Sequence, residues 1–285
     1  MRLCRFNGHR LGLVEGDSVL DVSDALNVLE PVHWPYPRGD AMIKMLPVIT
    51  EQVEILKDLA RTIPLSEVTL NAPVANPTKV VAAPVNYMKH LEEAIDDPET
   101  FSREHVRKIQ ETGLFLKAVS AIVGPAEGVR LRKLDRRNDH EIELVAVIGR
   151  TADRVSRDKA LDYVAGYTIG LDMTVRGPEE RSLRKSIDSY CVLGPWMVTA
   201  DEIPDPSKLA LELKVNGEVR QAAKTKDLII DVPGLIEFAS SFYTLHPGDI
   251  LMTGTPEGVG PVHPGDVITA KIDAIGEMTV GVSAA

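Results

Sequence analysis

The sequence predicts an α+β fold that is mainly β, with its strands closing into a barrel or roll. From Lys79 onward, short β-branched runs are separated by Gly and Pro, and helical periodicity is confined to a few segments. Before that point, the chain combines a hairpin signal with a single helical stripe. A doubly wound α/β sheet would instead alternate strands with helices. We therefore expect a small N-terminal α/β domain in residues 1–73 and a larger β-rich domain in residues 74–285.

The N-terminal domain is expected to begin with three strands: Arg2–Phe6, Leu11–Val14 and Asp17–Val22. The Asn7-Gly8 dipeptide between the first two strands favours a tight hairpin turn. A helix is expected over Thr50–Arg61, where one stripe carries the apolar residues Val53, Leu56, Leu59 and Ala60. The segment Asn71–Pro77 begins and ends in residues that break regular structure, so it marks the expected domain boundary.

The larger domain is expected to be built from many short strands. The candidates are Lys79–Ala83, Leu114–Lys117, Glu141–Gly149, Ala165–Asp172, Trp196–Thr199, Leu209–Val215, Ile250–Thr253 and Val267–Ile272. One helix is expected over Pro98–Thr112, with Asp97 as its N-cap and Gly113 as its stop. Helical patterns also fit Ser156–Tyr163 and Val232–Tyr243.

Composition excludes several classes of protein. The net charge of -10 argues against a nucleic-acid-binding surface, which needs a basic stripe. No apolar run approaches the roughly 18 residues of a membrane-spanning helix, and the N-terminus lacks the apolar core of a signal peptide. Two cysteines, Cys4 and Cys191, give no disulfide framework. We expect a cytoplasmic globular protein with no nucleic-acid or membrane partner.

Three carboxylates indicate a metal site. Glu141 and Glu143 are two residues apart at the start of an apolar run, so on a strand they point to the same face. Asp139 joins that face if the extended geometry starts early, and Asp172 follows another apolar run. Buried ionised carboxylates repel each other and lose hydration unless a hard divalent cation compensates. Mg²⁺ or Mn²⁺ suits such an oxygen set better than Zn²⁺. A solvated strand edge is the alternative interpretation.

A second cluster contains a histidine and a glutamate. His90 and Glu93 are three residues apart, so one helical turn places them on the same face. A carboxylate bonded to one imidazole nitrogen leaves the other nitrogen to take a proton from water. The alternative is a surface helix with an incidental contact. The charged stretch that follows this pair could cover the site as a lid.

Two further segments carry candidate ligand-binding groups. Arg176, Glu179 and Lys185 follow Asp172 closely, and a lysine beside a divalent cation can hold a substrate carboxylate or a developing enolate oxygen. The alternative is a salt-bridged surface lysine. The segment Thr253–Gly260 is rich in small residues, which let backbone amides and hydroxyls approach a ligand closely. It lacks the Gly-Lys-Ser/Thr ending of a phosphate loop, and a plain turn is the alternative.

In this order, the clusters resemble the fumarylacetoacetate hydrolase family. The resemblance covers the chain from about residue 77 to its end, and the ordered set of motifs is more specific than any single motif. The matching stretches are Asn86-Tyr87-x-x-His90-x-x-Glu93, Phe115-Leu116-Lys117-x-x-Ser120, Glu141-x-Glu143, Gly166-Tyr167-Thr168, Asp172-x-Thr174-x-Arg176, Lys185-Ser186-x-Asp188, Gly194-Pro195-Trp196, Val215-Asn216-Gly217-Glu218 and Thr253-Gly254-Thr255-Pro256.

The resemblance implies a β-roll catalytic domain in a homodimer, with Mg²⁺ or Mn²⁺ held by Glu141, Glu143 and Asp172. It makes His90 and Glu93 a water-activating dyad, and it places Lys185 and Thr255 at the oxo-acid end of a small anionic 2-oxo acid substrate. The other residues expected to contact the substrate are Tyr87, Lys117, Arg176 and Glu179. One departure is Glu179, where the family often has glutamine. The segment from Ile95 to Thr112 is longer than in compact members and forms either a fixed wall or a moving lid.

Three functions fit these features. The first is hydrolysis of the carbon–carbon bond of an acylpyruvate, such as fumarylpyruvate or maleylpyruvate from aromatic ring breakdown, to pyruvate and a second acid. The second is isomerisation, tautomerisation or decarboxylation of 2-oxo or 2-hydroxy-dienoic diacids, which also needs an enolate held at a metal. The third is a metal-stabilised binding protein without catalysis, which requires His90, Glu93 and Lys185 all to be incidental.

Overall fold

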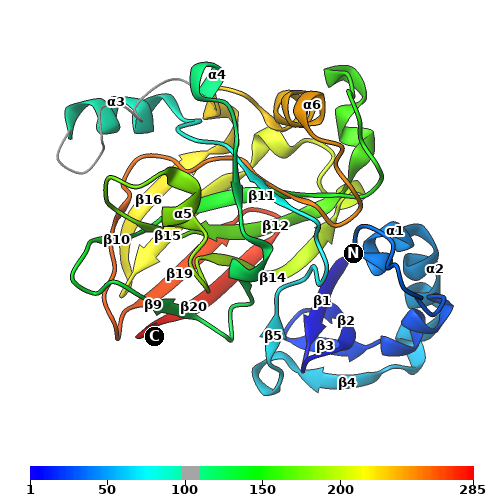
Figure 1. Cartoon of the computed structure of the whole chain (residues 1–285). Coiled ribbons are helices and arrows are strands. Elements are labelled where there is room, and N and C mark those ends of the chain that lie inside the picture. Colours follow the sequence, from blue (N-terminus) through cyan, green and yellow to red (C-terminus); the bar gives the residue numbers. More distant parts are fainter. Residues whose placement is uncertain (98–108) are drawn as a thin grey trace.

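The computed structural model describes residues 1–97 and 109–285. Its largest sheet extends across both of the predicted domains, because the N-terminal strand Arg2–Phe6 pairs with the strand Cys191–Thr199 of the larger predicted domain (Figure 1). In spatial order its main path is β4 (Arg61–Pro64), β3 (Ser18–Asp21), β2 (Arg10–Glu15), β1 (Arg2–Phe6), β14 (Cys191–Thr199), β12 (Val164–Asp172), β11 (Ile142–Ile148), β17 (Ile250–Met252), β6 (Val80–Ala82) and β7 (Phe115–Lys117). Two short strands lie off this path: β5 (Leu70–Asn71) on β1 and β8 (Ile122–Val123) on β14.

Two smaller sheets complete the β structure of the described residues. A five-stranded sheet has the order β16 (Glu218–Lys224), β15 (Ala210–Val215), β19 (Val267–Ile272), β20 (Gly276–Ala284) and β9 (Val129–Leu131). A three-stranded sheet has the order β13 (Thr174–Val175), β10 (Asn138–His140) and β18 (Gly260–Pro261). The mixed fold with a mainly β catalytic region, predicted from the sequence, is confirmed.

The helices lie outside these sheets (Figure 1). Their bounds are α1 (Ala41–Lys44), α2 (Leu46–Leu56), α3 (Met88–Asp96), α4 (Ile109–Thr112), α5 (Arg181–Lys185) and α6 (Val232–Phe242). Asp40 begins α1 by accepting hydrogen bonds from the amides of Met42 and Ile43, and Asp231 begins α6 by accepting from the amide of Gly234. Among the described residues, no helix is long and apolar enough to cross a membrane.

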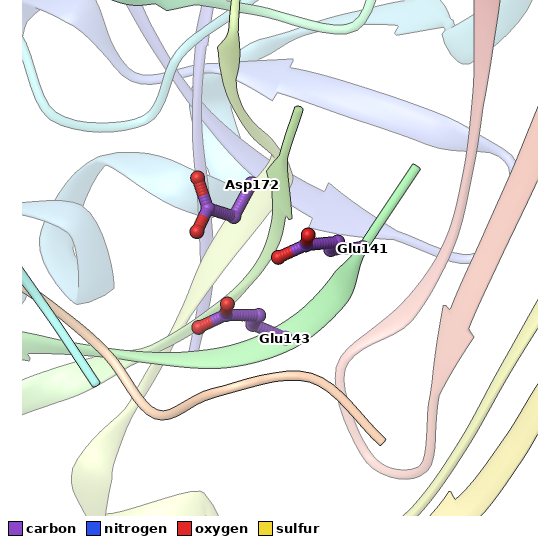
Figure 2. A group of neighbouring side chains, drawn as sticks. All are labelled: Glu141, Glu143 and Asp172. Atoms are coloured by element: carbon purple, nitrogen blue, oxygen red, sulfur yellow. The ribbon is translucent and has the colours of Figure 1, made fainter. Parts of the chain in front are cut away.

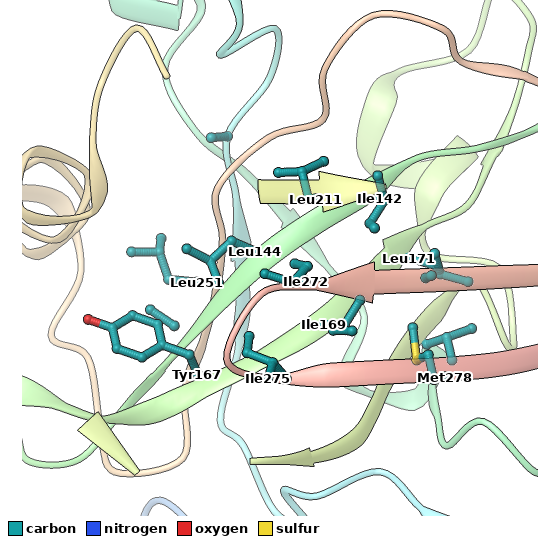
Figure 3. Packing of buried hydrophobic residues seen from close by; sticks show 14 of the residues in the cluster. Ile142, Leu144, Tyr167, Ile169, Leu171, Leu211, Leu251, Ile272, Ile275 and Met278 are labelled. Carbon is teal, nitrogen blue, oxygen red and sulfur yellow. The ribbon is translucent and has the colours of Figure 1, made fainter. Parts of the chain in front are cut away.

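The central strand β11 is buried on both of its faces, which explains its continuous apolar sequence. Ile142 and Leu144 point into a core shared with the five-stranded sheet, where they lie near Ile272 (Figure 3). Val145 and Val147 point the other way, into a core shared with the N-terminal strands and α2. The two cores lock β11 in position, so side chains at its first residues are held rigidly.

The predicted elements agree with the structure where the apolar pattern is strong. The strand Arg2–Phe6 is confirmed as predicted, and Asn7 and Gly8 have the positive φ angles of 46° and 89° that the hairpin turn requires. The helix over Val232–Tyr243 is confirmed to within one residue, as α6. The two buried strands of the catalytic region, Glu141–Gly149 and Ala165–Asp172, are confirmed with ends shifted by one residue, as β11 and β12.

Three helix predictions need correction or cannot be compared. The helix expected over Thr50–Arg61 is α2, Leu46–Leu56: Leu59 is exposed, and Arg61–Pro64 instead forms β4 against β3. The segment Ser156–Tyr163 forms a 3-10 helix over Arg157–Tyr163. Most of the helix expected over Pro98–Thr112 lies outside the described residues; Asp97, its expected N-cap, follows the end of α3.

Candidate metal centre and active site

The carboxylates of Glu141, Glu143 and Asp172 lie together at the ends of β11 and β12 (Figure 2). Glu141 and Glu143 share the strand face that continues into Val145, as the two-residue spacing predicts. The amide of Asp172 donates to the carbonyl of Glu141 over 2.9 Å, so antiparallel pairing places Asp172 beside both glutamates. One carboxylate oxygen from each residue lies within 4.8 Å of the others, and all three residues are buried. We call this group the carboxylate floor.

Gly170, opposite Glu143 on β12, is required for this packing. A Cβ atom at position 170 would lie 2.6 Å from Cγ2 of Val145 and 2.9 Å from Cε of Met252. The contact with Val145 is the restrictive one, because this β-branched side chain is fully buried and stiff, whereas the end of Met252 is flexible. The glycine therefore leaves room for the side chains of Val145 and Met252 beside the carboxylate floor.

Lysine side chains supply positive charge to the floor. Nζ of Lys185 donates to Glu141 Oε2 and to Asp172 Oδ2, each over 2.7 Å, and to Oγ1 of Thr174 over 2.6 Å. Nζ of Lys117 donates to Oδ1 of Asp172 and, over 3.0 Å, to the carbonyl of Tyr190. Both lysines are buried, so these charge-assisted bonds offset a large loss of hydration.

An arginine chain leads away from the floor. Arg176 donates from Nη2 to Oε1 of Glu141 over 3.1 Å and from Nε to Oδ2 of Asp139 over 2.7 Å. Arg137 donates to the other oxygen of Asp139, also over 2.7 Å. Asp139, which the sequence placed beside the two glutamates, therefore pairs with arginines and orients Arg176 against the floor.

The floor carboxylates differ in electrostatic environment. Burial raises the pKa of Glu141, but Lys185 and Arg176 outweigh burial and lower the pKa to about 2. Burial, followed by the neighbouring charge of Asp172, raises the pKa of Glu143 well above its usual value. Within the described residues, Glu143 has no salt bridge; its hydrogen-bond donor is the amide of Gly254, 2.6 Å from Oε2.

These features fit a divalent cation bound by oxygen ligands. The three oxygens converge at the ends of two buried strands, and among the described residues one of the three carboxylates, that of Glu143, forms no salt bridge. A hard divalent cation would compensate the negative charge of the carboxylates, and a ligand set of oxygen atoms alone suits Mg²⁺ or Mn²⁺. Glu141, Glu143 and Asp172 are the residues that could hold it.

His90 and Glu93 are brought together on α3. Oε2 of Glu93 lies 2.8 Å from Nδ1 of His90, and Oε1 of Glu93 accepts from the amide of Gly258 over 3.0 Å. His90 is buried, whereas Glu93 is partly exposed. We call this pair the α3 dyad. His90 also contributes to the lowered pKa of Glu141, after the larger contributions of burial, Lys185 and Arg176.

The loop after β17 joins the dyad and the floor. Its Gly254 amide binds Glu143, and its Gly258 amide binds Glu93. Gly254 has a φ of +96°, and a Cβ atom there would lie 2.7 Å from the Cβ of Asn86, so only glycine fits. Thr255 is buried on this loop and accepts a hydrogen bond from Gln221 over 2.8 Å.

The base of α3 is anchored by Asn86, which precedes it. Its side-chain amide donates to the carbonyls of Ile230 and Thr253 and accepts from the amide of Ile230, each over 2.8 Å. The next residue, Tyr87, is buried, and its hydroxyl has no hydrogen-bond partner among residues 1–97 and 109–285. Burial and the charge of Glu143 raise the pKa of that hydroxyl, so it stays protonated as a donor.

Glu179 is not brought into contact with the floor. Both of its carboxylate oxygens accept from Arg136, over 2.8 Å and 2.7 Å, and its side chain is 38% exposed. The hydrogen bonds from Arg136 hold the pKa of this carboxyl well below its usual range. Glu179, expected from the sequence to contact the substrate, therefore forms an ion pair with Arg136 just before α5.

Comparisons with known proteins agree with this geometry. Residues 79–283 match the family described as fumarylacetoacetate (FAA) hydrolase, C-terminal. The chain belongs to the fumarylacetoacetate hydrolase family. It is 56% identical to maleylpyruvate hydrolase of Aquipseudomonas alcaligenes over 284 residues, which cover 99% of each chain.

Solved structures of the family extend the comparison to the fold. A crystal structure of maleylpyruvate hydrolase from Sphingobium sp. SYK-6 is 42% identical, covers 100% of both chains and superposes with a TM-score of 0.86. A second crystal structure of that enzyme, in complex with manganese (II) ion and pyruvate, covers 100% of this chain and 99% of its own, with a TM-score of 0.84 and 42% identity.

The sequence analysis assigned no role to several residues that lie at or near the floor. Thr174 bonds both Glu141 and Lys185, and Gln221 bonds Thr255 from a strand that was not predicted. Arg181 lies on α5 one turn before Lys185, and the two cations are each 5.6 Å from the ring centre of Phe115. The four-residue spacing of Arg181 and Lys185 could have signalled a shared helix face.

Proposed function

We propose that this protein is a divalent-metal-dependent hydrolase that cleaves the carbon–carbon bond of an acylpyruvate to give pyruvate and a second acid. The observation that carries the proposal is the meeting of a buried carboxylate floor with a histidine–glutamate dyad through one loop. End-to-end similarity to maleylpyruvate hydrolases supports it. Maleylpyruvate and fumarylpyruvate are the substrates that we propose to test first.

Glu141, Glu143 and Asp172 would hold one Mg²⁺ or Mn²⁺ ion per subunit. When bound, such a cation supplies Lewis-acid polarisation of a 2-oxo acid and neutralises the charge of the floor. The manganese and pyruvate bound in the Sphingobium enzyme support this choice of cation and product. The lysines and Arg176 then fix the orientation of the carboxylates that face the substrate.

His90 acts as the general base in this proposal. In this proposal Glu93 accepts a hydrogen bond from Nδ1–H of His90, so Nε2 is the basic nitrogen that removes a proton from water. The resulting hydroxide attacks the C4 carbonyl of the 2,4-dioxo acid. Collapse of the tetrahedral adduct breaks the C3–C4 bond, and its electron pair forms the enolate of pyruvate. The proton held by His90 is returned to C3, which completes the balance of the reaction.

Lys185 would stabilise the developing enolate oxygen through the positive charge of its buried ammonium group, whose hydrogen bonds to Glu141, Asp172 and Thr174 hold it beside the floor. We place the 2-oxo acid end of the substrate against Lys185 and Thr255. The remaining proposed substrate contacts are Tyr87, Lys117, Arg176 and Glu179. Tyr87 is supported by its unpartnered buried hydroxyl within the described residues, whereas Glu179 would act at a distance through its ion pair with Arg136.

The test is a comparison of metal-stripped and Mn²⁺-loaded protein on a panel of acylpyruvates. Loss of the diketone ultraviolet absorbance is followed, and pyruvate is assayed separately. We expect metal-dependent absorbance loss with stoichiometric pyruvate, and one atom of labelled solvent oxygen in the new carboxylate. Ligand binding without release of pyruvate would refute hydrolysis and favour isomerisation, tautomerisation or decarboxylation of a dienoic diacid.

The proposal also includes a homodimer, as the family resemblance implies, and a cytoplasmic location, as the composition of the sequence indicates. Light scattering of the purified protein would test the dimer. Fractionation of the source cells would test the location. The two cysteines, Cys4 and Cys191, are buried as free thiols, which agrees with a reducing compartment.

A further inference from the structure

Gln221 is a buried amide on an otherwise exposed strand. It is the one buried residue of β16, Glu218–Lys224, and its side chain is 1% exposed. An apolar side chain would normally occupy such a position, because a buried amide must satisfy all its polar atoms. Gln221 reaches out of the five-stranded sheet toward the loop after β17 and the start of β11. Its burial therefore calls for a specific reason.

The orientation of the Gln221 amide is fixed by groups that can play only one role. The amide of Ile142 can only donate, and it lies 3.0 Å from Oε1 of Gln221. The carbonyl of Pro256 can only accept, and it lies 2.9 Å from Nε2. The usual ambiguity between oxygen and nitrogen in a glutamine side chain is thereby removed. Oε1 also faces Nδ1 of His140 at 3.2 Å, which places the ring proton of neutral His140 on Nδ1.

This orientation determines what the hydroxyl of Thr255 can do. Nε2 of Gln221 donates to Oγ1 of Thr255 over 2.8 Å, so the hydroxyl proton must point elsewhere. Within the part of the chain that the structure describes, that proton has no acceptor, although Thr255 is only 3% exposed. A buried donor without an acceptor costs stability unless a ligand provides one.

The unused donor lies beside the carboxylate floor. Thr255 directly follows Gly254, whose amide binds Glu143 over 2.6 Å. The hydroxyl proton of Thr255 needs an acceptor that is close to this loop and that accepts hydrogen bonds strongly. An anionic oxygen of a ligand bound at the floor would satisfy both conditions. The carboxylate of a 2-oxo acid is such a group.

We propose that Gln221 is a positioning residue that orients the Thr255 hydroxyl as a hydrogen-bond donor to the carboxylate of the 2-oxo acid. This inference rests on the proposed function, and it assigns to Gln221 a role in substrate affinity. Gln221 does not touch the substrate. Its Nε2 donates a hydrogen bond to a lone pair of Oγ1. The hydroxyl proton of Thr255 then points away from Gln221 and can be donated to an anion.

The experiment is a double-mutant cycle measured by binding. Calorimetry gives the Kd of pyruvate for Mn²⁺-loaded wild-type protein, Gln221→Met, Thr255→Val and the double variant. We expect Thr255→Val to raise the Kd at least about tenfold, as for a lost hydrogen bond to a charged group. Gln221→Met should raise it less, because the hydroxyl can still rotate into place. In the Thr255→Val background, Gln221→Met should then have no further effect.

Additional variants separate positioning from folding. Gln221→Glu keeps the acceptor for the Ile142 amide but makes the Thr255 hydroxyl donate to residue 221, so its effect should exceed that of Gln221→Met and shrink in the Thr255→Val background. Thr255→Ser keeps the hydroxyl and should retain a Kd close to that of the wild type. Gln52→Met, the same change on α2 of the N-terminal region, is the matched control. Melting temperature and Mn²⁺ affinity are recorded for every variant.

Two results would overturn the inference. Independent, additive effects of Gln221→Met and Thr255→Val on the Kd would show that Gln221 does not act through the hydroxyl. Wild-type protein that binds no pyruvate with Mn²⁺ present would remove the acceptor that the argument requires. If the protein turns over acylpyruvates but the two substitutions act additively on the Kd of pyruvate, the proposed function stands and the positioning role of Gln221 is rejected. If the two substitutions are coupled but no acylpyruvate is turned over, the hydrolase function is rejected and the positioning role is kept.

Discussion

The carboxylate floor and the α3 dyad belong to one site but are held in place by different means. The floor lies on β11 and β12, which are buried along their whole length and are fixed by two hydrophobic cores. The dyad lies on a nine-residue helix with exposed residues such as Met88 and Ile95. That helix is attached by Asn86 at its base and by the bond from Gly258 to Glu93. The proposed metal ligands are therefore built into the core, whereas the proposed proton-transferring pair lies on a partly exposed helix from which buried His90 points inward.

The largest effect is expected from Glu143→Gln, which tests whether the floor is a cation site. The loss of one anionic ligand should lower Mn²⁺ affinity and reduce turnover by at least about 10⁴-fold, since the cation supplies several kcal/mol. Burial and the charge of Asp172 raise the pKa of Glu143, so folding of the metal-free protein at neutral pH works against the ionised form of this carboxyl. Metal-free Glu143→Gln removes that cost and should be more stable by about 1–3 kcal/mol. Calorimetry, turnover and chemical denaturation with chelator measure the three quantities.

A matched control for this change is Glu127→Gln. Glu127 also accepts a hydrogen bond from a glycine amide, that of Gly124 over 2.8 Å, but it is exposed. It should change neither stability nor Mn²⁺ affinity. A Glu143→Gln protein that binds Mn²⁺ as well as the wild type would contradict the assignment of the floor.

The next effect concerns the dyad. His90→Ala should lower turnover by roughly 10²–10⁴-fold while Mn²⁺ affinity is retained, because the imidazole moves a proton and does not belong to the floor. Steady-state kinetics and Mn²⁺ calorimetry on the same preparation measure both properties. His33→Ala, at an exposed position of the N-terminal region, controls for the loss of an imidazole. An equal loss of metal affinity in His90→Ala would remove the distinction between floor and dyad.

A smaller effect is expected for Glu93→Gln. Glutamine can still accept from the Gly258 amide, but it lacks the charge that stabilises protonated His90. Turnover should fall roughly 10–100-fold, as for other partners that orient an active-site histidine. The neighbouring change Glu92→Gln, at an exposed position of the same helix, should leave turnover unaltered. If both variants lose activity equally, the helix as a whole is responsible rather than the dyad.

The same contrast explains what the sequence could predict. The floor could be predicted from the sequence, because its two glutamates are two residues apart before a continuous apolar run and a strand places such residues on one face. The bridging of Glu141 and Asp172 by Lys185 could not be predicted from the sequence, because the lysine lies 44 positions beyond Glu141 and only the folded chain brings them into contact. Local periodicity reports local geometry, and cross-chain hydrogen bonds leave no periodic signal.

Two strands show the same limit in the fold. β14 was predicted from Trp196, but it begins at Cys191, because Gly194-Pro195 within it resembles a break in the pattern. β16 was missed because six of its seven residues are exposed or partly exposed, and the buried one is the polar Gln221. A strand whose inward residue serves a hydrogen-bond network has no apolar alternation to reveal it.

The smallest effect on turnover should come from Asn86→Ala, which tests how α3 is attached. Three side-chain hydrogen bonds would be lost at a fully buried position, so the free energy of unfolding should fall by about 2–3 kcal/mol. Turnover should fall less than about tenfold in the remaining folded protein, because His90 and Glu93 keep their own contact. Chemical denaturation and kinetics measure the two effects, with exposed Asn76→Ala as the control.

An Asn86→Ala protein of normal stability but with turnover as low as that of His90→Ala would show that Asn86 takes part in the chemistry. The helix would then be more than a surface addition, and the division between a fixed floor and an attached dyad would have to be redrawn.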